Sequence, residues 1–79
     1  LTKILARALA PDIRVNAIAP GLVLRAEEMP PAEWERLVNR LPARRAAEAD
    51  EVADALEFLI KNEYITGQTI AIDGGYSLL

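Results

Sequence analysis

Two short and nearly uninterrupted apolar runs constrain most strongly what this chain can fold into. The first is I-R-V-N-A-I-A at 13–19, and the second is T-I-A-I-D at 69–73. Each run is followed at once by residues that break strands, Pro20-Gly21 after the first and Gly74-Gly75 after the second. Runs of this kind are typical of strands that are covered on both faces, as in a parallel sheet. The sequence therefore predicts two parallel strands joined by a long crossover connection.

Three segments with helical spacing of apolar residues accompany these strands. They are residues 1–10, which end before Pro11, residues 31–41, which begin after Pro30 and end before Pro42, and residues 49–61. In the third, Val52, Ala53, Leu56, Leu59 and Ile60 are expected to face inward. Two parallel strands cannot close a sheet, so further strands are expected beside residues 13–19. The predicted fold is α/β, the end part of a larger doubly wound parallel sheet with two strands and about three helices.

Composition excludes several classes of protein. The chain has no cysteine and no histidine, so it has no disulfide, no thiolate zinc site, no Cys nucleophile and no histidine triad. Nine Lys and Arg against 12 Asp and Glu give a net charge of -3, which argues against a nucleic-acid or polybasic membrane surface. No apolar run approaches the roughly 18 residues of a membrane span. We expect a cytoplasmic protein with no nucleic-acid partner and no membrane partner.

Four strings together resemble the C-terminal portion of the short-chain dehydrogenase/reductase family. They are L-T-K-I-L-A-R-A-L-A (1–10), R-V-N-A-I-A-P-G (14–21), P-A-R-R-A-A-E-A-D-E-V-A (42–53) and T-G-Q-T-I-A-I-D-G-G (66–75). Within the family, P-G-L-V-L and the later E-M-P are most similar to pteridine reductases and their bacterial relatives. The resemblance implies that residues 1–79 are the C-terminal segment of one Rossmann-type domain. It also implies an oxidoreductase that uses NADP(H) in preference to NAD(H) to reduce a pteridine-like or carbonyl small-molecule substrate.

Parts of the family's machinery are not found in this sequence. The four glycines do not form the Gly-rich turn that binds the dinucleotide, and neither Tyr64 nor Tyr76 begins a Tyr-x-x-x-Lys motif. Ser77 is the only serine. We therefore expect no catalytic residue within the 79, inactivity of this segment alone, and the remainder of its own domain as its partner. A non-catalytic nucleotide-sensing or scaffold protein on the same fold is the alternative.

The resemblance also implies cofactor contacts directly after the first strand. Pro20, Gly21, Leu22 and Val23 would border the nicotinamide, with the main chain at Val23 holding its carboxamide. Pro-Gly pairs also end strands without any further role. Arg25 stands where the family often has a Thr that contacts the cofactor diphosphate. It would meet a phosphate or an acidic substrate tail, or it is only a solvated loop charge.

Residues 22–41 correspond to the family's variable substrate loop and are expected to act as a substrate lid. Leu24, Met29 and Trp34 are the candidate substrate contacts, against the alternative that they pack an ordinary amphipathic helix. Asn16 is predicted to be a structural hydrogen-bonding residue, because an unpaired buried amide is costly. No metal site is expected, since the close carboxylate pairs lack supporting ligands. We expect a homodimer or homotetramer that pairs through residues 49–61 and 69–75.

Overall fold

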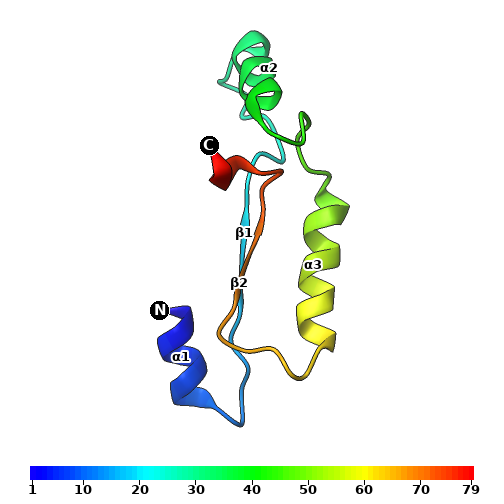
Figure 1. The fold of residues 1–79 in the computed structure, drawn as a ribbon. Coiled ribbons are helices and arrows are strands. Elements are labelled where there is room, and N and C mark those ends of the chain that lie inside the picture. The colour runs from blue at the N-terminus through cyan, green and yellow to red at the C-terminus, as the bar shows by residue number, and fades with distance from the viewer.

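The computed structural model describes all 79 residues as two strands, three helices and a final 3₁₀ turn. The strands lie side by side and parallel, with Ala17 opposite Thr69 and Pro20 opposite Ile72 (Figure 1). The elements run in the order α1 (Thr2–Leu9), β1 (Ala17–Pro20), α2 (Pro31–Arg40), α3 (Ala49–Lys61), β2 (Thr69–Ile72) and η1 (Tyr76–Leu78). This order confirms the predicted parallel crossover and the α/β class.

Strand β1 begins later and ends later than the sequence predicts. Residues 13–16 are not part of the regular ladder: the Val15 carbonyl still accepts the Gly67 N–H (2.8 Å), but the other bonds to the opposite segment involve side chains. The Asn16 amide donates to the Ile65 carbonyl (3.0 Å) and accepts from the Gln68 N–H (3.1 Å), which confirms its structural role. Pro20 is the last residue of the strand rather than the residue that stops it. Strand β2 likewise ends at Ile72, one residue earlier than predicted.

The helices follow the predicted bounds closely. Helix α1 ends at Leu9, and α2 ends at Arg40, one residue before the predicted end. Helix α3 spans the predicted residues and begins with a capping box, in which Glu51 accepts the Glu48 N–H. Leu41, which follows α2, is 2 % exposed and is among the few fully buried residues. None of these helices combines the length and the apolarity needed to cross a bilayer.

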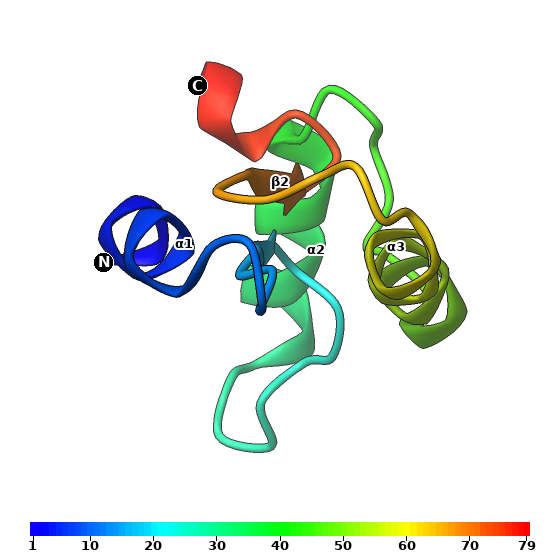
Figure 2. The ribbon, with the colours of Figure 1, turned by 90° about the horizontal axis from the view of Figure 1, so that it is seen from below.

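Helices α1 and α3 lie on opposite sides of the two strands (Figure 2). Helix α3 is fixed at its C-terminal end by Arg14, whose guanidinium donates to the carbonyls of Leu59 (2.8 Å) and Ile60 (2.9 Å). A hollow of about 630 Å³ separates its middle from β1. The predicted inward face therefore points toward β1 but is only partly covered, and Leu56 remains 51 % exposed.

The free edge of β1 explains this incomplete cover. The N–H groups of Ala17 and Gly21 donate to carbonyls beside β2, at Gln68 (2.9 Å) and Ile72 (3.0 Å). Successive residues of a strand bond alternately to its two sides, so the peptide groups of Ile18 point to the other, unpaired edge. This edge and the adjoining hollow support the expectation of a further strand beside β1.

Candidate functional site

The carboxyl ends of β1 and β2 meet at a cavity of about 420 Å³, which we call the strand-end cavity. The strands' last residues, the loops that follow them, helix α2 and the turn η1 all contribute to it. Its lining consists of Ala19, Pro20, Gly21, Leu22, Leu37, Ala71, Asp73, Tyr76 and Ser77. Ligands of open parallel sheets bind beyond the carboxyl ends of the strands, so this cavity is the candidate site.

The cavity owes its shape to small residues on the strands. Ala19 and Ala71 carry only methyl groups, which leaves room above the strand ends. Gly21 brings the two strand ends together, because a Cβ added there would lie 2.9 Å from the Asp73 Cα. Such an approach is possible only for glycine. The strand ends therefore form the floor of the cavity, and Leu37 and Tyr76 line it from α2 and η1.

The main chain after β1 offers unused hydrogen-bonding groups beside this floor. Val23 is half-buried, and neither its N–H nor its C=O bonds to another backbone group. By contrast, the Leu22 carbonyl accepts the N–H of Ala47 at 2.8 Å. The loop is therefore held at Leu22, while the peptide groups of Val23 remain available to a ligand.

An ion pair at the start of α3 supports the segment that holds this loop. The two terminal nitrogens of Arg45 donate to the two carboxylate oxygens of Glu51, at 2.7 and 2.8 Å. These bonds, together with the Glu48 N–H, lower the pKa of Glu51 to about 2. Arg45 and Glu51 line a small hollow of about 90 Å³ together with Leu22, directly behind the strand ends. The pair is solvent-exposed, so it orients the segment more than it stabilises the fold.

The turn after β2 is built around Asp73. Its carboxylate accepts the N–H groups of Gly75 and Ser77, both at 3.0 Å, and these bonds lower the pKa of Asp73. Gly75 has a φ of 93°, which glycine adopts without strain. These bonds and this φ give the turn a structural role, since they fix the start of η1 beside the end of β2. The turn also leaves an anionic side chain at the edge of the strand-end cavity.

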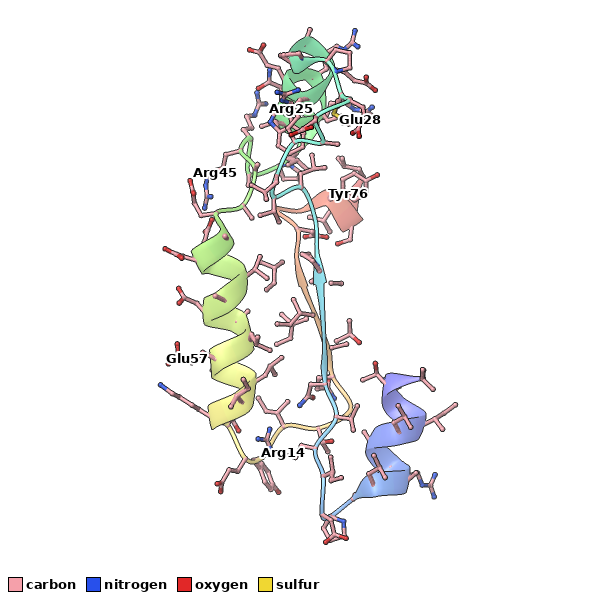
Figure 3. All side chains as sticks on the ribbon, turned by 180° about the vertical axis from the view of Figure 1, so that it is seen from behind. Arg14, Arg25, Glu28, Arg45, Glu57 and Tyr76 are labelled. Carbon is pink, nitrogen blue, oxygen red and sulfur yellow. The ribbon has the colours of Figure 1, made fainter.

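The structure separates the predicted site residues into two groups. Pro20, Gly21 and Leu22 line the strand-end cavity, and Val23 follows them. Arg25 instead donates to the carbonyl of Met29 within its own loop. Figure 3 shows Arg25 beyond the strand ends, at the same end of the molecule as Tyr76.

The predicted substrate contacts are not gathered in this cavity. Leu24 is 84 % exposed, whereas Met29 and Trp34 are half-buried on and before α2, and none of the three lines the cavity. Leu37 and Tyr76 line it instead. The spacing of Trp34, Leu37 and Val38 indicates an apolar face on α2 that includes Leu37, but no local pattern indicates that η1 folds back toward α2. No group of three or more acidic residues converges to hold a metal ion.

Two parallel strands joined by a helical crossover, with a cavity at their carboxyl edge, are typical of α/β domains of the nucleotide-binding class. The comparison with known families agrees with this class. Residues 1–77 match the family model described as enoyl-(acyl carrier protein) reductase. The chain belongs to the short-chain dehydrogenase/reductase family.

Individual relatives are similar over nearly the whole chain. The uncharacterized oxidoreductase YmfI of Bacillus subtilis is 46 % identical over 77 residues, which is 91 % of this chain and 32 % of the relative. The dihydromonapterin reductase of Klebsiella pneumoniae is 35 % identical over 78 residues, 99 % of this chain and 32 % of the relative. The chain thus spans about a third of the length of the curated relatives it matches.

Two solved structures carry the same fold. FolM alternative dihydrofolate reductase 1 from Brucella suis, in complex with NADP, superposes with a TM-score of 0.92 at 50 % identity, over 99 % of this chain and 32 % of the other. A small-chain dehydrogenase in complex with NADPH gives a TM-score of 0.88 at 43 % identity, over 99 % and 38 % of the two chains. These matches confirm the Rossmann-type fold and the relation to pteridine reductases.

Proposed function

We propose that residues 1–79 form one end of a single Rossmann-type domain in an NADP(H)-dependent reductase of a pteridine-like or carbonyl compound. The observation that carries this proposal is the strand-end cavity. The peptide groups of Val23, the residue after the cavity-lining Leu22, take no part in backbone hydrogen bonds. The relatives solved with NADP and NADPH support the choice of cofactor. The dihydromonapterin and dihydrofolate reductases among the relatives support a pteridine-like ring as substrate.

The residues after β1 suit the nicotinamide end of this cofactor. A carboxamide has one donor group and one acceptor group, and the free C=O and N–H of Val23 complement them. The small residues Ala19, Gly21 and Ala71 leave room for a planar ring above the strand ends. Pro20 and Leu22 border the same space. When bound, the cofactor supplies the hydride.

The proton donor in this proposal lies outside the 79 residues. Helix α1 runs antiparallel to β1, so positions toward its N-terminal side lie nearer the strands' carboxyl ends (Figure 1). We place the family's Tyr-x-x-x-Lys motif there, upstream of Leu1. Within the chain, Tyr64 is fully exposed, next to Pro11 and Glu63 before β2. Tyr76 lines the cavity but has no lysine after it.

Filling the cavity in the complete protein tests the proposal. Ala71→Leu adds three carbons to the floor and is expected to weaken NADPH or substrate binding at least tenfold. Thr69→Leu is the matched control, since Thr69 points to the same side of β2 two residues earlier and does not line the cavity. The control is expected to change binding less than twofold. Equal effects of both substitutions would overturn the assignment of the site.

The same experiment distinguishes a reductase from a non-catalytic nucleotide-sensing or scaffold protein on the same fold. NADPH binding is followed by its fluorescence, and turnover by NADPH oxidation with a dihydropterin and with simple carbonyl compounds. Turnover that is lost in Ala71→Leu supports the reductase. Tight NADPH binding without turnover of any of these substrates would instead favour a nucleotide-sensing protein.

We also propose that the complete protein is a homodimer or homotetramer that pairs through α3 and the last strand. Phe58 on α3 supports this, because its side chain is 53 % exposed and does not line the hollow beside β1. Sedimentation of the complete protein at micromolar concentration is the test. A clean monomer would refute the proposal.

A further inference from the structure

A second hollow adjoins the strand-end cavity on the side of the C-terminus. It has a volume of about 280 Å³ and is lined by Leu37, Arg40, Tyr76 and Leu79. Leu37 and Tyr76 line both hollows, so the two hollows adjoin at these side chains between α2 and η1, and together we call them the groove. Figure 1 shows these two elements at the same end of the sheet. The groove leads from the strand ends to Arg40 at the last turn of α2.

Arg40 differs from Arg25 and Arg45, two other cations at this end of the molecule. The guanidinium of Arg25 is bonded to its own loop, and that of Arg45 is paired with Glu51. Arg40 takes part in neither of the two ion pairs of the chain and lines the groove directly. An unpaired guanidinium beside an apolar hollow is suited to a carboxylate, which it binds through two parallel hydrogen bonds.

The opposite end of the groove carries the reverse charge. Asp73 lines the strand-end cavity, and two backbone N–H groups hold its carboxylate. Between Asp73 and Arg40 lie the aliphatic side chain of Leu37 and the ring of Tyr76. A ligand with a carboxylate at one end would be repelled at Asp73 and attracted at Arg40. The charges therefore set the direction in which such a ligand lies.

We propose that this groove is a substrate subsite for the tail of a planar ring compound, and that Arg40 binds a carboxylate at the end of that tail. The ring lies over the strand ends, the tail runs past Leu37 and Tyr76, and the carboxylate reaches Arg40. This proposal rests on the proposed function, because it extends the same cavity. It deepens that function by naming Arg40 as the residue that would select a ring substrate with an acidic tail.

The test compares two ring compounds in the complete protein saturated with NADPH. Dihydrofolate carries carboxylates on its tail, whereas dihydrobiopterin has the same dihydropterin ring with a neutral tail. Arg40→Gln is expected to raise the dissociation constant of dihydrofolate on the order of tenfold, as for loss of a charged hydrogen-bonding partner. Its effect on dihydrobiopterin is expected to stay within twofold. Arg40→Lys keeps the positive charge but loses the planar pair of N–H donors, so its dissociation constant for dihydrofolate is expected to lie between those of the wild type and Arg40→Gln.

Arg36→Gln is the matched control, because Arg36 is an exposed cation one turn earlier on α2 and lines neither hollow. It is expected to leave both dissociation constants unchanged. Raising the salt concentration should weaken dihydrofolate binding in the wild type and much less in Arg40→Gln.

The outcomes separate this subsite from the proposed function. If NADPH and both rings bind but Arg40→Gln affects them equally or not at all, the subsite is wrong and the reductase assignment stands. If the protein binds NADPH but neither ring, the subsite and the pteridine-like substrate are both wrong. If NADPH does not bind, the proposed function itself fails.

Discussion

The isolated chain of residues 1–79 is expected not to fold cooperatively, and its dimensions give the size of the effect. Its radius of gyration is 15.4 Å, whereas a compact chain of this length has about 12 Å. Its accessible surface is 6194 Å², about 1,500 Å² more than a compact protein of 8.7 kDa exposes. The excess is the part that neighbouring structure would cover.

The excess surface outweighs the whole stability of a small domain. If a little more than half of it is apolar, as on ordinary protein surfaces, about 850 Å² of apolar surface is left uncovered. At roughly 25 cal/mol per Å², this corresponds to about 20 kcal/mol of missing hydrophobic stabilisation, as an upper estimate. Net stabilities are only about 5–15 kcal/mol. Leu1, Ile4 and Leu78 contribute to this surface, with exposed fractions of 87, 70 and 80 %.

Circular dichroism and thermal melting of the 79-residue peptide at two concentrations form the assay. We expect a weak, broad transition and association that increases with concentration, because exposed apolar faces and strand edges pair with one another. The same residues within the complete protein are the control and are expected to melt in one sharp transition. A sharp transition of the isolated peptide, independent of concentration, would refute the reasoning.

Three further predictions concern the complete protein. Glu51→Gln removes the ion pair with Arg45. The pKa of Glu51, about 2, lies below the ordinary 4.5, so the Glu51 carboxylate contributes stability above pH 4.5 that is lost as the pH falls toward 2. The melting temperature of the wild type should therefore fall more steeply than that of the variant over this range, whereas Lys61→Met, which removes an exposed pair on the same helix, should not change this slope. Gly21→Ala places a Cβ 2.9 Å from the Asp73 Cα, so it is expected to lower the stability by about 1–3 kcal/mol and to weaken NADPH binding. An unchanged melting temperature and unchanged NADPH binding would show that the strand ends can separate. Trp34→Ala, at a half-buried residue that does not line the cavity, is expected to lower the melting temperature and to leave KM for a ring substrate nearly constant; a KM raised about fivefold with unchanged melting would show instead that Trp34 contacts the substrate.

Sequence alone predicted the elements that local patterns specify. Apolar spacing and proline positions located all three helices, and the two apolar runs indicated the parallel strands. The strand bounds were less accurate, because Asn16 replaces a backbone ladder with side-chain hydrogen bonds that periodicity does not reveal. Pro20 also belongs to the strand, since its peptide nitrogen faces the unpaired edge and no donor is needed there.

The candidate site was predictable only where one segment forms it. Pro20–Leu22 follow a strand end, so the general rule for parallel sheets places them at the site. Tyr76 and Arg40 come to the same groove from different segments, 36 residues apart in the chain. Their proximity depends on the Asp73 turn and on how α2 lies across the strand ends, which no local pattern specifies.

The parallel pairing of β1 with β2 also has a consequence for the order of folding. Ala17 pairs with Thr69, so the first contact of the sheet closes a loop of about 52 residues. Closing such a loop costs about 3.5 kcal/mol of chain entropy beyond the constant term. The helices form within microseconds, whereas pairings this distant in sequence are slow. During synthesis, β1 therefore stays unpaired on this edge until Thr69–Ile72 have left the ribosome.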